Sequence, residues 1–321
     1  MKIDKNKPNT GKFMTITVIL SQELIGVIRL AIPIILVFQL YPGLTSNIPV
    51  QLACTCVIGA YIYYLSYSST KKQDAGLLYS PFGEHKQQIE QYIAACKIDP
   101  KDIQIKYAYV GEGTALNMFN TVVLDPTLCS TIKDDPEAAK VQGIFDNAIS
   151  PTLPEKQKER LTKIKESLSP KAQAFIFKHE LGHAFHNYTH KKLILMGIIA
   201  SVATYSGILA SVMTMKALGG IAAIGIGMLT GGFVDLLLSY SSNVFFKVQE
   251  EKKADFFAAR YSSCEEINAA AHFFEQHKII MEQNEAFPGL LGKLPTTVLS
   301  GHPDGTTRVQ YLRKIATKKQ A

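Results

Sequence analysis

The sequence contains no tryptophan, and its 321 residues include only five cysteines. Because the cysteine count is odd and no Cys-x-x-Cys pair is present, the sequence favours neither a disulfide framework nor a thiolate zinc cage as the basis of the fold. Charged residues make up only 19% of the chain against 47% hydrophobic residues, and the mean hydropathy is +0.07. The apolar residues gather in long uncharged runs, which is not the pattern of an ordinary soluble globular protein.

Signatures of phosphate and nucleic-acid binding are also missing. The chain has no Gly-rich phosphate loop, no nucleic-acid-binding motif and no internal repeat. The net charge of +7 comes from 34 basic and 27 acidic residues. Many lysines stand beside the apolar runs, so we expect the positive charge of the protein to face anionic lipid at the bilayer surface. We predict no nucleic-acid partner.

Four apolar segments approach the length of about 20 residues that crosses a bilayer. They cover residues 24–41, 50–67, 193–215 and 217–240. The fourth is rich in glycine, which lets helices approach closely in lipid, so the third and fourth predict a tightly packed hairpin. The first segment follows a lysine-rich arm, but a second span comes soon after it without a convincing Ala-x-Ala-like site. We therefore expect an uncleaved hairpin.

Lysines also predict the orientation of these spans. Lys71 and Lys72 follow the second span and Lys191 and Lys192 precede the third, whereas the turn at 42–47 is uncharged. The positive-inside rule then places both ends of each hairpin in the cytoplasm. The predicted organisation is a transmembrane hairpin at 1–68, a cytosolic part at 69–192, a second hairpin at 193–240 and a second cytosolic part at 241–321.

The first cytosolic part predicts helices with a small β-sheet. An amphipathic pattern over residues 85–96 indicates a helix, and alternation over 103–109 indicates a strand. A Gly-Glu-Gly turn at 111–113 leads to a returning strand at 116–124, and the polar stretch 133–168 is expected to be an inserted loop with helical pieces. The predicted fold class is mainly α with a small sheet.

One short helix carries the chemistry. Ser169 is a predicted N-cap with Pro170 at the first helical position. The helix contains His179-Glu180-Leu181-Gly182-His183, in which a spacing of four places both imidazoles on one face. Two neutral histidines bind Zn²⁺ in such motifs, and Glu180 takes a proton from the activated water as general base. Gly182 marks a place where this helix must pack closely.

A third ligand is expected on the helix after the fourth span. Glu251 and Asp255 lie one helical turn apart there, so Glu251 can complete the site for one Zn²⁺ per chain. Asp255 can accept the outer N–H of a ligand histidine and fix its tautomer. Glu250 leaves an ambiguity of one residue, and the register with the following Ala254-Asp255 favours Glu251.

Together these motifs resemble the HtpX-like membrane zinc metallopeptidases, gluzincins related to the CAAX prenyl endopeptidases. That family pairs His-Glu-x-x-His with a downstream Glu-x-x-Ala-Asp, matched here by residues 251–255. The tail at 301–312 resembles the family's closing His-Pro, Arg and Leu signature. Asn117-Met118-Phe119 resembles its Asn-Ala-Phe edge-strand motif, with Met118 departing from the usual small residue.

The resemblance implies a cytosolic gluzincin-type domain and further site residues. His302 and Arg308 become candidates for steadying the oxyanion or the peptide, although a structural role for the His-Pro turn and its arginine is the alternative. Asn117 and Phe119 become candidate substrate contacts, because an extended peptide can add as a strand along this edge. The longer 133–168 stretch departs from the family pattern.

We therefore expect a membrane-bound zinc endopeptidase that cleaves unfolded or damaged membrane proteins, as in protein quality control. The family suggests a bacterial inner membrane with the site on the cytoplasmic side. Three alternatives remain: a narrower CAAX-type processing role, an inactive membrane scaffold, and a site-2-type intramembrane protease in which Asp304 is a ligand. His186 and His190, four residues apart, allow a second metal, but a polar helix end beside the membrane is the preferred interpretation.

Overall fold

The computed structural model describes residues 47–76, 79–110, 115–129, 132, 134–282 and 305–320. They form two compact units. We call residues 47–65 together with Ile194–Ser239 the span unit, and the described residues from Ser66 to Leu193 and from Tyr240 onward the mixed unit. The mixed unit is therefore assembled from two stretches of chain with part of the span unit between them.

Three long apolar helices account for three of the predicted spans. α3 covers Ile48–Gly76, α8 covers Tyr188–Leu218 and α9 covers Gly220–Ser241. Within the described residues, the stretches long and apolar enough to cross a membrane are Ile48–Lys72, Tyr188–Met215 and Gly220–Tyr261. The predicted span at 24–41 lies outside the described residues.

Glycines bring the helices of the span unit into backbone contact. A Cβ placed on Gly227 of α9 would lie 2.6 Å from the carbonyl oxygen of Gly207 on α8. A Cβ on Gly59 of α3 would lie 2.5 Å from the carbonyl oxygen of Gly197. Contacts this close admit no side chain, so the predicted tight hairpin of α8 and α9 is confirmed, and α3 packs on α8 in the same way.

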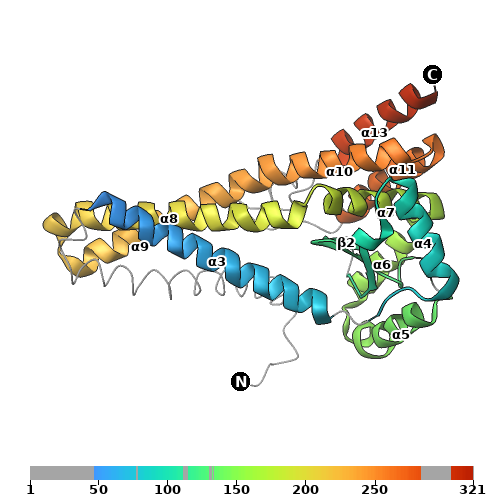
Figure 1. Cartoon of the computed structure of the whole chain (residues 1–321), viewed down its shortest axis with the longest axis horizontal. Helices are drawn as coiled ribbons and strands as arrows, with labels where there is room; N and C mark the ends of the chain where they lie inside the picture. Colours follow the sequence, from blue (N-terminus) through green and yellow to red (C-terminus); the bar gives the residue numbers. More distant parts are fainter. Residues whose placement is uncertain are drawn as a thin grey trace. The chain divides into compact units, whose positions relative to one another are not determined.

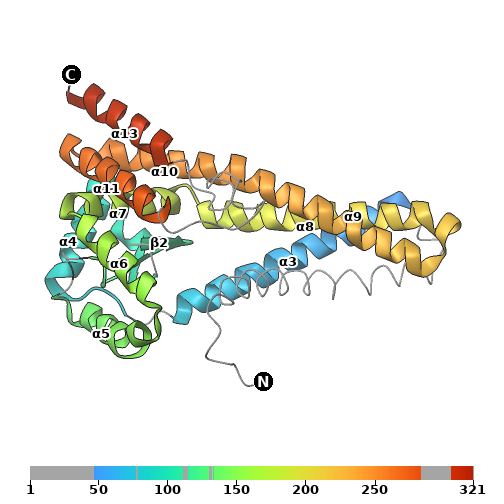
Figure 2. The ribbon, with the colours of Figure 1, turned by 180° about the vertical axis from the view of Figure 1, so that it is seen from behind.

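In the mixed unit, α7 (Pro170–Phe185) is the central helix. Figures 1 and 2 show it between a layer of helices and a small sheet. The helical layer consists of α10 (Val248–Tyr261), α11 (Cys264–Glu282) and α13 (Gly305–Gln320). α7 buries Phe175 against this layer, beside Ala258 and Leu312. On its other side Phe177 and Leu181 join the core under the sheet, so α7 is fixed from both faces.

The sheet has three short strands in the order β1-β3-β2. β1 (Gln104–Tyr107) runs parallel to β3 (Thr121–Leu124), and β2 (Ala115–Met118) runs antiparallel to β3. β2 therefore lies at an edge of the sheet, where its outer backbone groups face away from β3. The expected region of helix and strand at 85–109 is confirmed by α4 (Gly83–Ala95), a 3₁₀ turn at Pro100–Asp102 and β1.

One local prediction was wrong and a second was right only in part. The expected single strand at 116–124 is a hairpin, because the chain turns at Phe119, which has a left-handed φ of +55°. The Asn117 amide closes this turn by donating to the carbonyl oxygens of Phe119 and Thr121 at 2.9 and 3.3 Å. The sequence contains no glycine or proline at this point, so the strongest sequence signals of a turn are missing.

The stretch expected to be an inserted loop with helical pieces does contain helices, and they make up most of its described residues. Asp135 caps α5 (Pro136–Ile144) by accepting from the N–H groups of Glu137 and Ala138. A π turn at Phe145–Ile149 and a 3₁₀ turn at Ser150–Thr152 connect α5 to α6 (Glu155–Ser167). α6 is rich in lysine and glutamate, which favour helices, and it buries Leu161 and Ile164. These two apolar residues, three apart, form the buried face of α6, although the helix is polar overall.

Candidate metal centre

The helix that carries the candidate ligands begins as predicted. Pro170 occupies the first turn of α7, and the Ser169 hydroxyl accepts a hydrogen bond from the N–H of Ala172 at 3.3 Å. The imidazoles of His179 and His183 are both buried, with 5% of each residue exposed. Both therefore face the interior of the mixed unit, where their ring nitrogens need defined partners.

Gly182 lets α7 and α10 cross at close range. A Cβ on Gly182 would lie 3.0 Å from the Ala254 Cα and 3.1 Å from the Phe257 Cβ, closer than ordinary contact. Gly182 stands beside His183, and Ala254 stands between Glu251 and Asp255 in the sequence. The crossing therefore presents the acidic residues of α10 directly to the histidines of α7.

Three side chains converge at this crossing. The Nε2 atom of His179 lies 3.4 Å from Oε2 of Glu251, and Nε2 of His183 lies 3.2 Å from Oε1 of the same carboxylate. A fourth side chain, that of the half-buried Glu180, lies beside the two histidines. One ligand atom each of His179, Glu180 and His183 lie within 4.8 Å of one another. Two imidazole nitrogens and a carboxylate around one point are a donor set that zinc uses.

Asp255 determines which nitrogen of His179 is available. Its fully buried carboxylate accepts a hydrogen bond from Nδ1 of His179 at 2.8 Å. When His179 is neutral with its proton on Nδ1, the lone pair of Nε2 points at Glu251, so a cation is favoured between these two acceptors, either a second proton on the imidazole or a metal ion. Burial lowers the pKa of His179, but Asp255 and Glu251 outweigh it and raise the pKa to about 10. The same electrostatics suit a metal ion.

Arg308 and Tyr311 of α13 hold Asp255 in turn. Arg308 donates to both carboxylate oxygens, from Nε at 2.8 Å and from Nη2 at 2.6 Å, and the Tyr311 hydroxyl donates to Oδ2. The guanidinium carbon lies 3.7 Å from the centre of the Phe274 ring. Burial lowers the pKa of Arg308, but the Asp255 carboxylate raises it further, so the guanidinium stays charged.

This arrangement bears on the predicted role of Arg308. Because its donors are directed at Asp255, its contacts favour the structural alternative over a contact with the peptide or oxyanion. Tyr311 was missed in the sequence. Its spacing of three from Arg308 places both on one helix face and was the available signal. His302, the other candidate of the tail, lies outside the described residues.

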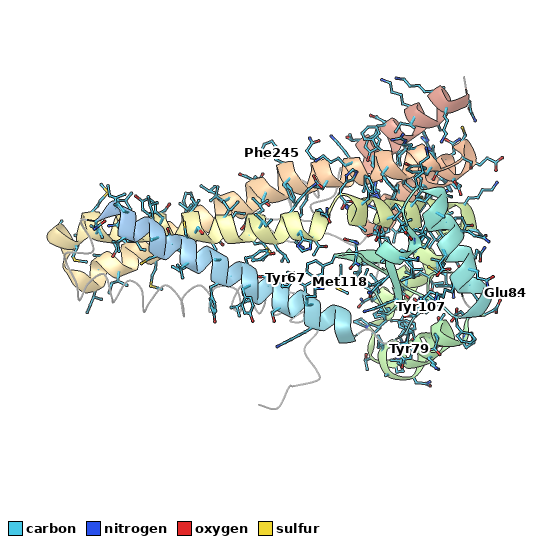
Figure 3. The ribbon with its side chains drawn as sticks, in the orientation of Figure 1. Tyr67, Tyr79, Glu84, Tyr107, Met118 and Phe245 are labelled. Atoms are coloured by element: carbon cyan, nitrogen blue, oxygen red, sulfur yellow. The ribbon has the colours of Figure 1, made fainter. Side chains whose placement is uncertain are left out.

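The two edge-strand candidates are also engaged within the protein. Besides its bonds across the turn, Asn117 accepts a hydrogen bond on Oδ1 from the Thr189 hydroxyl at 3.2 Å. Phe119 is buried, and its ring centre lies 5.2 Å from that of Tyr67 and 4.8 Å from that of His190. Figure 3 labels Tyr67 near the end of α3 and Met118 at the neighbouring end of β2.

Glu250, the alternative third ligand, and the possible second metal pair His186 and His190 have other neighbours. Glu250 pairs with Lys191 at 3.4 Å and Lys253 at 2.5 Å, so Glu251 is the glutamate that faces the histidines. The His186 ring contacts Phe185 and Phe257, whereas the His190 ring contacts Phe119 and Tyr67. The two rings therefore belong to different aromatic groups, which speaks against a shared second metal.

The intramembrane alternative finds no support in the described residues. Asp304, which it requires as a ligand, lies outside them. α7 is also not among the candidate membrane spans found in the described part of the chain.

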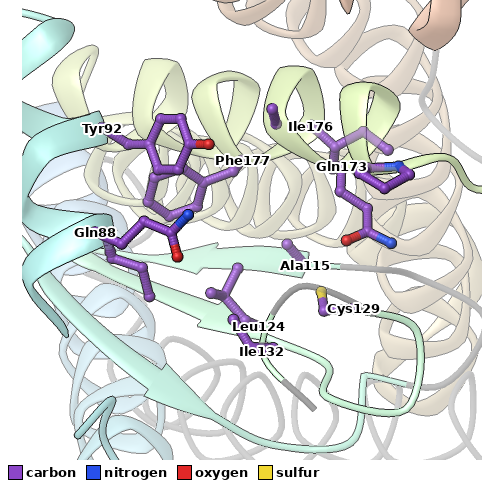
Figure 4. A pocket seen from close by; sticks show the side chains of 12 residues that line it. Gln88, Tyr92, Ala115, Leu124, Cys129, Ile132, Gln173, Ile176 and Phe177 are labelled. Carbon is purple, nitrogen blue, oxygen red and sulfur yellow. The ribbon is translucent and has the colours of Figure 1, made fainter. Parts of the chain in front are cut away.

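A separate cavity of about 70 Å³ lies between α4, α7 and the sheet. Figure 4 shows Gln173, Ile176 and Phe177 of α7 directed toward it, opposite Leu124. No charged side chain lines this cavity, and none of the converging residues of α7 and α10 belongs to it. It is a mainly apolar recess that reaches the exposed residues Gln88 and Tyr92, distinct from the candidate metal centre.

Comparison with known proteins identifies the family. No curated protein and no solved structure matches the chain significantly. The sequence profile of peptidase family M48 matches residues 83–316, a region that contains α4, the sheet, α7 and the helices that carry Glu251, Asp255 and Arg308. Since this match covers well over half of the 321 residues, the chain belongs to peptidase family M48.

Proposed function

We propose that the protein is a membrane-bound zinc endopeptidase in which His179, His183 and Glu251 hold one Zn²⁺ and Glu180 is the general base. Membership of family M48 indicates a metallopeptidase. The observation that carries the finer proposal is the convergence of both Nε2 atoms on the Glu251 carboxylate at 3.4 and 3.2 Å. Asp255 supports it by orienting His179 through Nδ1.

The proposed chemistry is the hydrolysis of a peptide bond. When bound, Zn²⁺ lowers the pKa of a water toward 7 and polarises the peptide carbonyl. Glu180 accepts the proton of the attacking water and delivers it to the leaving amine. Its half-buried carboxylate lies beside the two histidines, which is where such a base must stand.

The proposed substrates are extended polypeptides, in particular unfolded or damaged membrane proteins. β2 pairs only with β3 among the described residues, so a peptide can add to its free edge through backbone hydrogen bonds without a strict sequence requirement. The long apolar helices support a membrane location. We further propose that residues 69–192 and 241–321 lie on the cytoplasmic face of a bacterial inner membrane, because lysines flank the spans there.

The test compares detergent-purified wild type with Glu180→Gln, both loaded with zinc, for cleavage of casein. We expect stoichiometric zinc in both proteins and cleavage by the wild type alone. Equal cleavage by both would show that Glu180 is not the base. Wild type that retains no stoichiometric zinc would contradict the metal site and favour the scaffold alternative.

A further inference from the structure

Three consecutive residues at the start of α8 contact three different parts of the mixed unit. Tyr188 stacks on Phe246 with ring centres 6.1 Å apart, and its ring centre lies 4.7 Å from that of His183. Thr189 donates to Asn117, and His190 packs on Phe119. We call residues 188–190 the junction, because they follow the helix of the candidate ligands and open a candidate membrane span.

The contact made by Thr189 is specific. The Asn117 amide group donates to two carbonyl oxygens of the turn, so Oδ1 is left as an acceptor, and the Thr189 hydroxyl is the donor that reaches it. These three hydrogen bonds also fix the orientation of the Asn117 side-chain amide, with Nδ2 toward the turn and Oδ1 toward Thr189. Thr189 is buried, with 8% exposed, so water competes little for this bond.

The turn that Asn117 closes is strained. Phe119 adopts a φ of +55°, which is unfavourable for a bulky side chain with a Cβ. Such a conformation persists where the surroundings hold it. Here Tyr67 and His190 flank the ring, and the Lys71 ammonium lies 5.4 Å from its centre. The end of β2 is therefore positioned by tertiary contacts, of which Thr189 makes the hydrogen bond.

We infer that Thr189 is a positioning residue that aligns the edge strand β2 with the metal centre, so that an extended peptide on β2 presents its backbone at the right distance. This inference rests on the proposed function. The junction suits this role because Tyr188 contacts His183 while the adjacent Thr189 contacts β2. Two adjacent residues of the junction thereby contact β2 on one side and the candidate ligand His183 on the other.

Thr189→Val keeps the shape of the side chain and removes the hydrogen bond to Asn117. The first measurement is binding of a fluorescently labelled casein peptide to zinc-loaded Glu180→Gln protein, in which no cleavage occurs. Loss of one hydrogen bond corresponds to a rise in Kd of about two- to tenfold. Zinc affinity should stay at the level of the parent protein, and Thr189→Ser should restore peptide binding. In the active protein the same substitution should lower kcat as well as raise KM, because a misaligned peptide carbonyl also slows the chemical step.

The matched control is Thr214→Val, also on α8. The Thr214 hydroxyl bonds to the carbonyl oxygen of Ala210 within its own helix at 2.8 Å, so its loss should leave the peptide Kd unchanged. A double-mutant cycle with Asn117→Ala should show that the two effects do not add, because both variants break one contact.

An unchanged Kd in Thr189→Val would overturn the inference. So would a parallel loss of zinc affinity without rescue by serine, since that indicates a general structural role. Failure of the proposed function is seen separately, as absence of Glu180-dependent cleavage by the wild type, while the binding measurement still reports on Thr189.

Discussion

Replacing Gly182 by alanine tests whether the crossing of α7 and α10 sets the geometry of the metal centre. The added Cβ would lie 3.0 Å from the Ala254 Cα, 3.1 Å from the Phe257 Cβ and 3.2 Å from the Ala254 carbonyl oxygen. Two of these three atoms belong to backbone, which cannot rotate away. The two helices must therefore separate by a few tenths of an ångström.

The expected effect on stability is modest. Overpacking costs about 1–3 kcal/mol, and the better helix propensity of alanine returns about 1 kcal/mol. The net destabilisation is therefore about 0–2 kcal/mol. The effect on metal binding is larger, because ligand distances tolerate only about 0.2 Å and Glu251 would move with α10 away from His179 and His183. We expect zinc affinity to fall about 10–100-fold, the range seen when supporting groups around a site are lost.

The assay is competition for zinc with a chelator, combined with thermal unfolding of the zinc-free protein. Gly143→Ala on α5 is the matched control, since a Cβ there would meet nothing within 4 Å. It should stabilise the helix by up to about 1 kcal/mol and leave zinc affinity unchanged. The reasoning is refuted if Gly182→Ala binds zinc as tightly as the wild type.

Three further predictions have defined outcomes. Asp255→Asn should lower zinc affinity about 10–100-fold and destabilise the protein by about 3–5 kcal/mol, because it leaves Arg308 buried without its carboxylate; chelator competition and thermal unfolding measure both effects. Tyr311→Phe removes one donor to that carboxylate and should cost about 1.5–3 kcal/mol, with an unchanged melting temperature counting against the contact. In the span unit, Gly227→Ala should lower the melting temperature in detergent, since its Cβ would lie 2.6 Å from a backbone oxygen, whereas Gly232→Ala meets nothing within 4 Å and should not.

The parts of the molecule that could be predicted from the sequence are those governed by local rules. Ser169 and Pro170 mark the start of α7 because capping depends on residues within one turn. The spacing of His179 and His183 on one face follows from helical periodicity. The long apolar runs indicate the helices α3, α8 and α9 because crossing a bilayer requires length and hydrophobicity alone.

The parts that could not be predicted depend on contacts between distant residues. Thr189 meets Asn117 across 72 positions, and Tyr311 meets Asp255 across 56. The turn at Phe119 depends on the packing of its ring and on the Asn117 hydrogen bonds, with no glycine or proline at this point of the sequence. Arg308 was found by resemblance, but only the contacts of its guanidinium indicate that it acts through Asp255.

The division of the mixed unit into two stretches of chain has a consequence for synthesis on the ribosome. Arg308 follows His179 by 129 residues, and the span-unit residues Ile194–Ser239 are made in between. At about 5–20 residues per second, the buried cluster around Asp255 is completed on the order of 10 s after its first histidine emerges. The residues of two candidate membrane spans are thus synthesised before the centre can be completed, and a truncated nascent chain that ends before α13 lacks both Arg308 and Tyr311.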